Sequence, residues 1–514
     1  MADTRHQATR LDAIEGRFDP LLLGAVLALA CLGVVMVASS SIAIGEGLGV
    51  GPFYFLAKHA VYLVVGGLIA VWLMRTELKS IEQFDRVLLL GAVVLLVLVF
   101  VPGIGRSVNG ARRWLDFGIA GFQAVEAVKL MYIVWLASYL KRFSAEVGAT
   151  WPAMLKPLGV ATLLVVLLGL QPDFGSLSLI LAITAGMLVL GGVHLPRMAA
   201  PVVAGLPVLA IVAIAEPYRM RRLTSFMDPW ADPFDSGYQL TNALMAVGRG
   251  EWFGVGLGGS IQKLAYLPEA HTDFILAVIA EELGFVGVCA VIALYAVVVW
   301  RAFSIGLACV EMRRHFAGYC AFGIGLMVAL QSFVSIGVNL GLLPTKGLTL
   351  PLVSYGGSSV LATCAAMGLL LRVSYELDRA QRQVARLRGD ERGRVLAAQS
   401  THRDGVDRDP VLGNQARLHA AGRAQPAHRH PARVQGRGHG QAGEDVPARA
   451  AGQDHHRGFV ARARGACHHE DLPRFGSTRP RSRLVPRPPD LAAAALRAAA
   501  GSGCAVAGTV GRSS

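Results

Sequence analysis

Long, nearly uninterrupted apolar runs constrain this chain more than any other feature of its sequence. A transmembrane α-helix needs about 20 consecutive apolar residues to cross the hydrocarbon core of a bilayer. Apolar residues make up 53% of the 514 residues, and they are bunched into runs rather than spread with the period of a soluble helix. The runs therefore predict a membrane protein. Candidate spans lie near residues 20–42, 54–74, 86–102, 122–140, 153–171, 175–193, 197–215, 273–300, 317–341 and 355–373.

The basic residues between these runs predict how the chain is oriented. Short cytoplasmic loops carry an excess of Lys and Arg, and a cytoplasmic N-terminus puts most short basic loops on that side. We therefore predict an all-α polytopic membrane protein with ten transmembrane helices, both termini in the cytoplasm, and a large extracytoplasmic loop, 216–272, between helices 7 and 8. The inner loops contain Arg75, Lys79, Arg86, Lys141, Arg142, Arg197, Arg301, Arg313 and Arg314.

The chain changes character after about Gly393. From there to the end it has 19 Arg against 9 acidic residues, a net of +10 out of +14 for the whole chain, and no Lys, Ile, Tyr, Met or Trp. The missing residues have A/T-rich codons, so we interpret the stretch as out-of-frame translation of GC-rich DNA, disordered and without function. A genuine disordered tail is the alternative. The predicted organisation is a cytoplasmic N-terminus (1–19), a transmembrane domain (20–380) with the outer loop 216–272, and a disordered cytoplasmic tail (381–514).

Two function classes are disfavoured by what the sequence lacks. The excess positive charge lies in a tail with almost no aromatic residues to stack on bases, which argues against nucleic-acid binding. The sequence has no P-loop, no GxGxxG entering a βαβ unit, no HExxH and no GxSxG. We therefore expect no nucleotide cofactor.

The segment Tyr266–Gly284, YLPEAHTDFILAVIAEELG, turns from a polar outer loop directly into a long apolar helix. Thr272 is suited to cap this helix and Asp273 to lie in its first turn, where the positive helix terminus favours an ionised carboxylate. At the membrane surface such a carboxylate can accept a proton from a sugar hydroxyl of a membrane-anchored substrate. The alternative is a carboxylate that only caps the helix.

Glu281 and Glu282 follow about two turns deeper in the same apolar segment. A charge at that depth is expensive unless it is paired, protonated or facing a cavity. We expect one of the two carboxylates to face the interior of the bundle. A cationic partner is the structural explanation for either.

A second charged cluster lies in the first outer loop, Pro102–Gly121, which is followed by an apolar helix. Arg112, Arg113 and Trp114 put two guanidinium groups and an indole at headgroup level, against the positive-inside rule. Guanidinium groups bind phosphate oxygens in bidentate fashion, which predicts a pyrophosphate ligand. Anchoring to anionic lipid headgroups is the alternative.

Glu126 and Lys129 lie three residues apart in the helix after this loop, and therefore on one face. Each can neutralise the other inside an otherwise apolar segment. Ionisable residues within the membrane are often functional. A purely structural pair that holds helices together is the alternative, and the spacing slightly favours it over direct chemistry.

Three further segments are unusually polar and rich in Gly and Pro. They are QPDFG, with Gln171 and Asp173; the outer-loop stretch MDPW at 227–230; and LPTKG leading to SYGGSS, with Lys346, Ser354 and Ser358. Non-helical backbone at membrane depth is tolerated only where protein or water satisfies its polar groups. We therefore expect these segments to line one polar cavity.

At these residues the sequence resembles the SEDS family (shape, elongation, division and sporulation proteins), in its FtsW-type division branch. The resemblance spans roughly residues 15–380. NGARRW, QPDFGS, DPWADPFDSGYQ, LPEAHTDFI with AEELG, and LPTKGLTLPLVSYGGSS occur in the family's order. The tail after about Gly393 has no counterpart in the family pattern.

The resemblance implies a ten-helix enzyme that polymerises lipid II into glycan strands at the outer face of the bacterial cytoplasmic (inner) membrane, at the division septum. It implies a class B penicillin-binding transpeptidase as partner, alongside other division proteins and membrane lipids. It assigns the catalytic carboxylate to Asp273 and matches Glu126 and Lys129 to a functionally important pair. We also expect His271, beside Asp273, to bind the substrate or support the site.

The mechanism that we predict is an inverting displacement in which Asp273 deprotonates the acceptor hydroxyl. Arg112, Arg113 or a divalent cation (Mg²⁺ or Mn²⁺, with ligands unknown) offsets the charge on the pyrophosphate leaving group. Two other functions stay open on the sequence. Broken helices and buried charges also suit a flippase or transporter for the lipid-linked precursor, and a non-catalytic division scaffold remains if the chemistry belongs to a partner.

Overall fold

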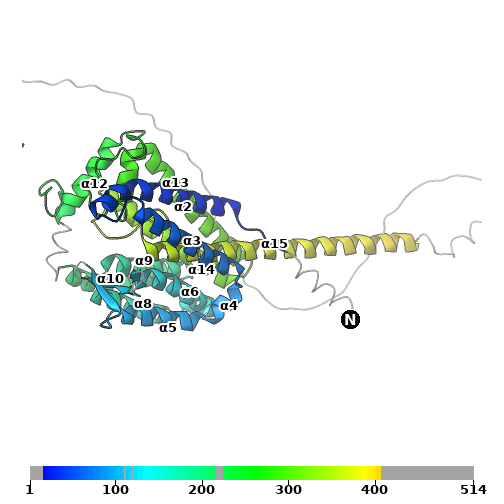
Figure 1. Cartoon of the computed structure of the whole chain (residues 1–514). Helices are drawn as coiled ribbons and strands as arrows, with labels where there is room; N and C mark the ends of the chain where they lie inside the picture. The colour runs from blue at the N-terminus through cyan, green and yellow to red at the C-terminus, as the bar shows by residue number, and fades with distance from the viewer. Residues whose placement is uncertain (1–14, 109–110, 117–120, 215–223, 265, 407–514) are drawn as a thin grey trace, which may run out of the picture. The chain divides into compact units, whose positions relative to one another are not determined.

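The computed structural model describes residues 15–108, 111–116, 121–214, 224–264 and 266–406, and only the backbone of 206–214 and 390–406. These residues are almost entirely helical (Figure 1). The elements are α2 (Pro20–Gly47), α3 (Tyr54–Arg75), α4 (Leu78–Gln83), α5 (Asp85–Leu98), β1 (Gly105–Val108), β2 (Ala111–Asp116), β3 (Gly121–Gln123), α6 (Ala124–Arg142), α7 (Ser144–Val147), α8 (Trp151–Leu170), α9 (Phe174–Leu190), α10 (Leu195–Ile214), α12 (Tyr238–Arg249), α13 (Ile275–Glu311), α14 (His315–Asn339) and α15 (Gly357–Val406).

Each apolar run found in the sequence coincides with one of these helices, from α2 at the first run to α15 at the last. Six helices in the described part of the chain are long and apolar enough to cross a bilayer: α2, α3, α8, α13, α14 and the segment Gly357–Gly389 of α15. Helix α9, with 17 residues, is apolar but shorter. The prediction of a multi-pass membrane protein is therefore confirmed.

Small residues allow the helices to pack closely. Helix α14 contacts α6, α9, α12, α13 and α15, and α3 packs along α15. A Cβ on Gly323 of α14 would collide with Ile133 of α6, and a Cβ on Gly368 of α15 would lie 2.6 Å from the Cα of Ala70 in α3. Lipid tails are as apolar as the helices, so this close packing, rather than hydrophobic burial, holds them together.

A small antiparallel sheet replaces the irregular loop that we expected after α5, so the all-α prediction was wrong here. Strand β1 pairs with β2, Val108 lying opposite Ala111, and β2 pairs with β3. Leu115 is buried against Val99 and Ala124 and anchors the sheet to the bundle. Strands of three to six residues are too short to give a clear period in the sequence. The predicted turn at Asn109-Gly110 lies outside the described residues.

Helix α13 is interrupted at Gly284, whose φ of 69° and ψ of −167° are not helical. The backbone groups that this break frees are paired by the segment after α12, as irregular backbone at membrane depth requires. A Cβ on Gly284 would collide with the backbone of that segment. The four hydrogen bonds run from the amides of Val255 and Gly256 to the carbonyls of Glu281 and Glu282 (2.9 and 3.1 Å), and from the amides of Phe285 and Val286 to the carbonyls of Glu251 and Trp252 (2.9 and 3.1 Å).

Helix α15 continues to Val406, well past the span expected at 355–373 (Figure 1). We expected disorder from residue 381, and the structure corrects this for 381–406, whose backbone is helical. The segment is rich in Arg, Gln, Ala and Leu, which favour helix. Arg382 also pairs with Asp378 one turn earlier, at 2.7 Å. Residues 407–514 lie outside the described part of the chain.

Candidate functional site

Asp273 lies two residues before α13 and is partly buried. Our prediction that Thr272 caps the helix was wrong, and so was the placement of Asp273 in its first turn. The N-cap is Phe274, which makes no side-chain cap bond. Thr272 Oγ1 instead donates to Glu269 Oε2 at 2.6 Å. The carbonyl of Glu269 accepts from the amides of Thr272 and Phe274, and this turn delays the start of the helix.

Asn339, the last residue of α14, fixes the backbone around Asp273. Its fully buried side chain donates from Nδ2 to the Asp273 carbonyl at 2.9 Å and to the Ser335 carbonyl at 2.8 Å. Its Oδ1 accepts from the amide of Ala277 at 3.1 Å. The first amides of a helix lack partners within the helix. Asn339 therefore caps α13 from another helix, the role that we had weighed for Asp273, and it shares the Ala277 amide with the carbonyl of Phe274 at 3.0 Å.

The loop between α14 and α15 lies against the Asp273 carboxylate. A Cβ placed on Gly347 would be 3.2 Å from Asp273 Oδ2. Burial lowers the pKa of the adjacent Lys346, while the Asp173 carboxylate acts in the opposite direction and raises it. Asp173 itself caps α9, accepting from the amide of Ser176 at 3.2 Å. Three residues predicted from separate motifs, Asp173, Asp273 and Lys346, thus share one neighbourhood.

Glu126 and Lys129 form a buried pair in α6, as their spacing predicted. Lys129 Nζ lies 2.9 Å from Glu126 Oε1 and 2.9 Å from Gln331 Oε1 of α14. Gln331 Nε2 in turn donates to the carbonyl of Thr349 at 3.0 Å. The pair therefore connects α6, through Gln331, to the same loop that contacts Asp273. This arrangement supports a positioning role for the pair.

The two predicted phosphate-binding arginines have different environments. Arg113 donates from Nε to the carbonyl of Gln171 at 3.2 Å and from Nη2 to the carbonyl of Pro172. It thereby holds the QPDFG segment, whose Gln171 side chain is buried and donates to the carbonyl of Leu96 at 2.9 Å. Arg112 alternates to the other face of β2 and is exposed. Of the two, Arg112 is the side chain with access to a ligand.

Trp114 is partly buried on β2, where it lies opposite Gln123 of β3. A Cβ on Gly121 would lie 3.4 Å from the Trp114 ring. The indole therefore packs on the small sheet. It connects the sheet face to the residues that lead into α6.

His271 is buried in an aromatic cluster beside Asp273. Its ring lies 5.1 Å from that of Phe55 in α3 and 5.3 Å from that of Tyr355. Its carbonyl accepts from the amide of Tyr355 at 2.9 Å, which ties the two loops together. Burial lowers the pKa of His271, with Glu269 acting weakly the other way. His59 of α3 is buried next to Tyr355, at 6.2 Å between ring centroids.

The predicted serines of the SYGGSS motif are both buried. Ser354 Oγ accepts from the amide of Leu350 at 2.8 Å and so closes a turn in the loop. Ser358 lies in the first turn of α15. Ser354 therefore has a structural function in shaping the loop that reaches Asp273.

Glu281 and Glu282 are fully buried, and each has a cationic partner. Arg249 Nη1 lies 2.7 Å from Glu281 Oε1, and Lys263 Nζ lies 2.6 Å from Glu282 Oε1. Ser260 also donates to Glu281, and Ser39 of α2 donates to Glu282 at 2.8 Å. The structural explanation therefore applies to both carboxylates.

Metal binding was also expected as a possibility, and we tested the described residues for it. Nowhere among them do three or more His, Cys, Asp or Glu side chains converge as a ligand set.

Sequence reasoning missed Asn339, Gln331 and His59. Each is a polar residue inside an apolar helix, which signals a specific partner. That signal does not say which residue the partner is. In the structure, Asn339 and Gln331 lie two turns apart on α14 and reach α13 and the 340–356 loop, respectively.

With this geometry in hand, the chain can be compared with known proteins. Residues 20–379 match the model of the FtsW, RodA and SpoVE family, described as cell cycle protein. The chain is 66% identical over 387 residues to the probable peptidoglycan glycosyltransferase FtsW of Xanthomonas oryzae pv. oryzae, a match covering 75% of this chain and 79% of that protein. FtsW of Legionella pneumophila subsp. pneumophila is 48% identical over 359 residues, covering 70% and 91%.

Two solved structures resemble the fold. A chain from a study of structural coordination of polymerization and crosslinking by a peptidoglycan synthase complex is 31% identical, with a TM-score of 0.58, covering 70% of this chain and 98% of that one. The rod shape determining protein RodA of Thermus thermophilus is 30% identical, with a TM-score of 0.52, covering 70% and 96%. The family match at residues 20–379 includes the helices that carry the site.

Proposed function

Because the chain belongs to the FtsW, RodA and SpoVE family of cell cycle proteins, we propose that it is a peptidoglycan glycosyltransferase that polymerises lipid II into glycan strands during septal wall synthesis. The observation that carries the proposal is the position of Asp273. Its backbone is held by Asn339, and its carboxylate faces the Gly347 backbone in a loop that also contains Lys346. A carboxylate fixed in this way, and not needed as a helix cap for Ala277, is suited to act as a base.

In the proposed reaction, the acceptor sugar hydroxyl attacks the anomeric carbon of a membrane-anchored donor. The new C–O bond forms as the bond to the undecaprenyl pyrophosphate breaks, with inversion, and the hydroxyl proton passes to Asp273. Arg112 offsets the charge that develops on the pyrophosphate leaving group. Arg113 acts indirectly, by holding the QPDFG segment.

We further propose the topology that this reaction requires. Ten transmembrane helices correspond to the apolar runs, the termini are cytoplasmic, and the loop 216–272 and Asp273 face outwards. The domain 20–380 carries the activity, and the tail from about 393 has no part in it. The protein works in the bacterial inner membrane at the septum, with a class B penicillin-binding transpeptidase as partner. The synthase complex among the similar structures supports a partner of this kind.

A divalent cation, Mg²⁺ or Mn²⁺, remains a separate hypothesis, since no ligand set supports it among the described residues. Chelation by EDTA followed by re-addition of each metal tests it directly. Loss of polymerisation on chelation and recovery with one metal would support a cation supplied with the substrate. Unchanged activity in EDTA would remove the cation from the mechanism.

The experiment that tests the function is polymerisation of purified lipid II in detergent, with and without the transpeptidase partner. A polymerase makes glycan with no membrane to cross, whereas a flippase or a scaffold makes none. We expect glycan strands from the wild type and none from Asp273→Ala, with an unchanged unfolding temperature and partner binding. Full activity of Asp273→Ala would exclude Asp273 as the base, and no polymer from the wild type in either condition would reject the polymerase in favour of a flippase or a scaffold.

A further inference from the structure

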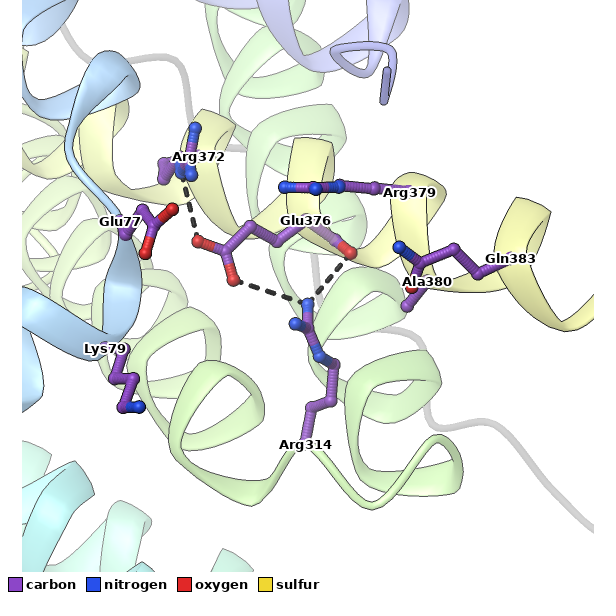
Figure 2. A pocket seen from close by; sticks show the side chains of 8 residues that line it. All are labelled: Glu77, Lys79, Arg314, Arg372, Glu376, Arg379, Ala380 and Gln383. Atoms are coloured by element: carbon purple, nitrogen blue, oxygen red, sulfur yellow. Dashed lines mark hydrogen bonds and ion pairs between the residues drawn. The ribbon is translucent and has the colours of Figure 1, made fainter. Parts of the chain in front are cut away.

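A charged cavity lies at the opposite end of the bundle from Asp273, on the side that the proposed topology puts in the cytoplasm. Its volume is about 230 Å³. Three elements meet there: α4 with the residue before it, the start of α14, and the middle of α15 (Figure 2). The lining side chains are those of Glu77, Lys79, Arg314, Arg372, Glu376, Arg379, Ala380 and Gln383.

The inner part of this cavity is an ion network around Glu376. Arg372 Nε lies 3.1 Å from Glu376 Oε1, and Arg314 Nη1 lies 3.4 Å from Glu376 Oε2. The backbone amide of Leu78 also donates to Glu376 Oε1 at 3.0 Å. Arg372 reaches the carbonyl of Met74, at the end of α3, at 3.1 Å. The Glu376 carboxylate therefore pairs with two guanidinium groups and connects α4, α14 and α15.

The charges of the cavity do not balance. Its walls contain four cationic residues and two carboxylates, so two positive charges exceed the negative ones. Figure 2 shows Lys79 on the α4 side and Arg379 on the α15 side of the Glu376 network.

The cavity lies at the level of the membrane surface. Trp72, in the last turn of α3, is 65% exposed, and exposed Trp residues at helix ends mark the interface between lipid and water. The exposed apolar residues Val61, Leu68 and Trp72 follow one another along α3 toward this end. Lipid phosphates lie at this depth, with acyl chains beside such a helix face. Basic pockets between transmembrane helices on the cytoplasmic side suit phosphate headgroups.

We propose that this cavity binds the phosphate of an anionic phospholipid headgroup from the inner leaflet. Lys79 and Arg379 make the contacts that select an anionic lipid, and Arg314 and Arg372 shape the floor of the site. Inorganic phosphate carries the same anionic group as the lipid headgroup and is the alternative ligand. The location at the interface, beside an exposed apolar helix face, favours the lipid. This site is separate from the proposed glycosyltransferase chemistry.

The test uses the full-length protein purified in detergent, with native mass spectrometry to count retained lipid. Phosphatidylglycerol is the anionic probe and phosphatidylcholine the zwitterionic one. We expect the wild type to retain phosphatidylglycerol preferentially, and Lys79→Gln/Arg379→Gln to retain it about fivefold less for each charge removed. The matched control is Arg86→Gln/Lys156→Gln, which removes two exposed cations from the same side of the membrane but outside the cavity.

Three results would overturn the proposal. Equal losses in the two double variants would mean that the cavity has no special role. No preference for phosphatidylglycerol in the wild type would exclude an anionic lipid site. Displacement of the lipid by millimolar inorganic phosphate, with calorimetric phosphate binding that the Lys79→Gln/Arg379→Gln variant loses, would assign the site to free phosphate. Elution volume and unfolding temperature confirm that each variant is folded, and none of these readouts depends on glycan synthesis.

Discussion

The break in α13 at Gly284 and the start of α13 at Asp273 are both places where backbone leaves the helix near charged residues, but they are stabilised differently. At the break, Glu281 and Glu282 are fully buried, and each carboxylate forms an ion pair with a cation and accepts a hydrogen bond from a hydroxyl. At the start, a neutral side chain, Asn339, satisfies the backbone. The Asp273 carboxylate lies in a partly exposed position beside the loop.

This difference gives a criterion for distinguishing a structural carboxylate from a catalytic one on the same helix. A fully buried carboxylate with a cationic partner forms an ion pair that holds two segments of the chain together. A partly buried carboxylate beside a loop, with its neighbouring backbone held by another residue, is placed to meet a bound ligand. The family's chemistry is therefore expected at Asp273, although Glu281 and Glu282 lie in the same element.

The largest effect that this comparison predicts is on stability at the break. Lys263→Met leaves Glu282 buried without its cation, and Glu282 is 0% exposed while Lys263 is 8% exposed. Removing one partner of a buried pair costs about 3–5 kcal/mol. We expect a strongly lowered unfolding midpoint in detergent. Lys156→Met, which removes an exposed lysine, is the matched control and should change the midpoint little.

The double variant Lys263→Met/Glu282→Met makes this prediction sharper. With both charges replaced by apolar side chains of similar size, most of the lost stability should return, since neither side chain is then a buried, unpaired charge. If the double variant were as unstable as the sum of the two single variants, the ion pair would not explain the break.

A smaller effect is expected at the start of the helix from Asn339→Ala. The change leaves the Asp273 carbonyl without its partner, at a cost of about 1–3 kcal/mol for an unsatisfied buried group, while the Ala277 amide keeps its bond to the carbonyl of Phe274 at 3.0 Å. Because the backbone of Asp273 also loses its anchor, we expect polymerisation of lipid II to fall more than the unfolding midpoint implies. Asn242→Ala removes one bond within α12 and is the control. Unchanged activity in Asn339→Ala would separate the anchor from catalysis.

The sequence predicted much of the bundle, and the reason is physical. Each helix of the membrane part needs its own apolar run, so composition alone located them, from α2 to α15. It did not locate the break at Gly284, because a glycine in an apolar helix is compatible with a continuous helix until the chain that occupies the gap is known. The small sheet was missed since its strands are too short to give a period.

For the same reason, the sequence predicted Asp273 in the site but not the residue that holds its backbone. Asp273 was singled out because it lies where a polar loop enters an apolar helix, and the resemblance to the SEDS family gave it the catalytic role. Its anchor, Asn339, lies 66 residues further along the chain. A polar side chain in an apolar helix signals a partner but not its identity, so only the packing of α14 against α13 connects them.

The smallest effect that tests the comparison is that of one methyl group beside Asp273. Gly347→Ala puts a Cβ 3.2 Å from Asp273 Oδ2, closer than an ordinary contact, whereas Gly356→Ala in the same loop meets Ser359 Cβ at 3.4 Å. The carboxylate or the loop must shift by a few tenths of an ångström. We therefore expect kcat for lipid II polymerisation to fall several-fold in Gly347→Ala, with an unfolding temperature equal to that of Gly356→Ala. Equal activity in the two variants would mean that the chemistry tolerates displacement of this carboxylate, and the contrast between Asp273 and the structural carboxylates Glu281 and Glu282 would not hold.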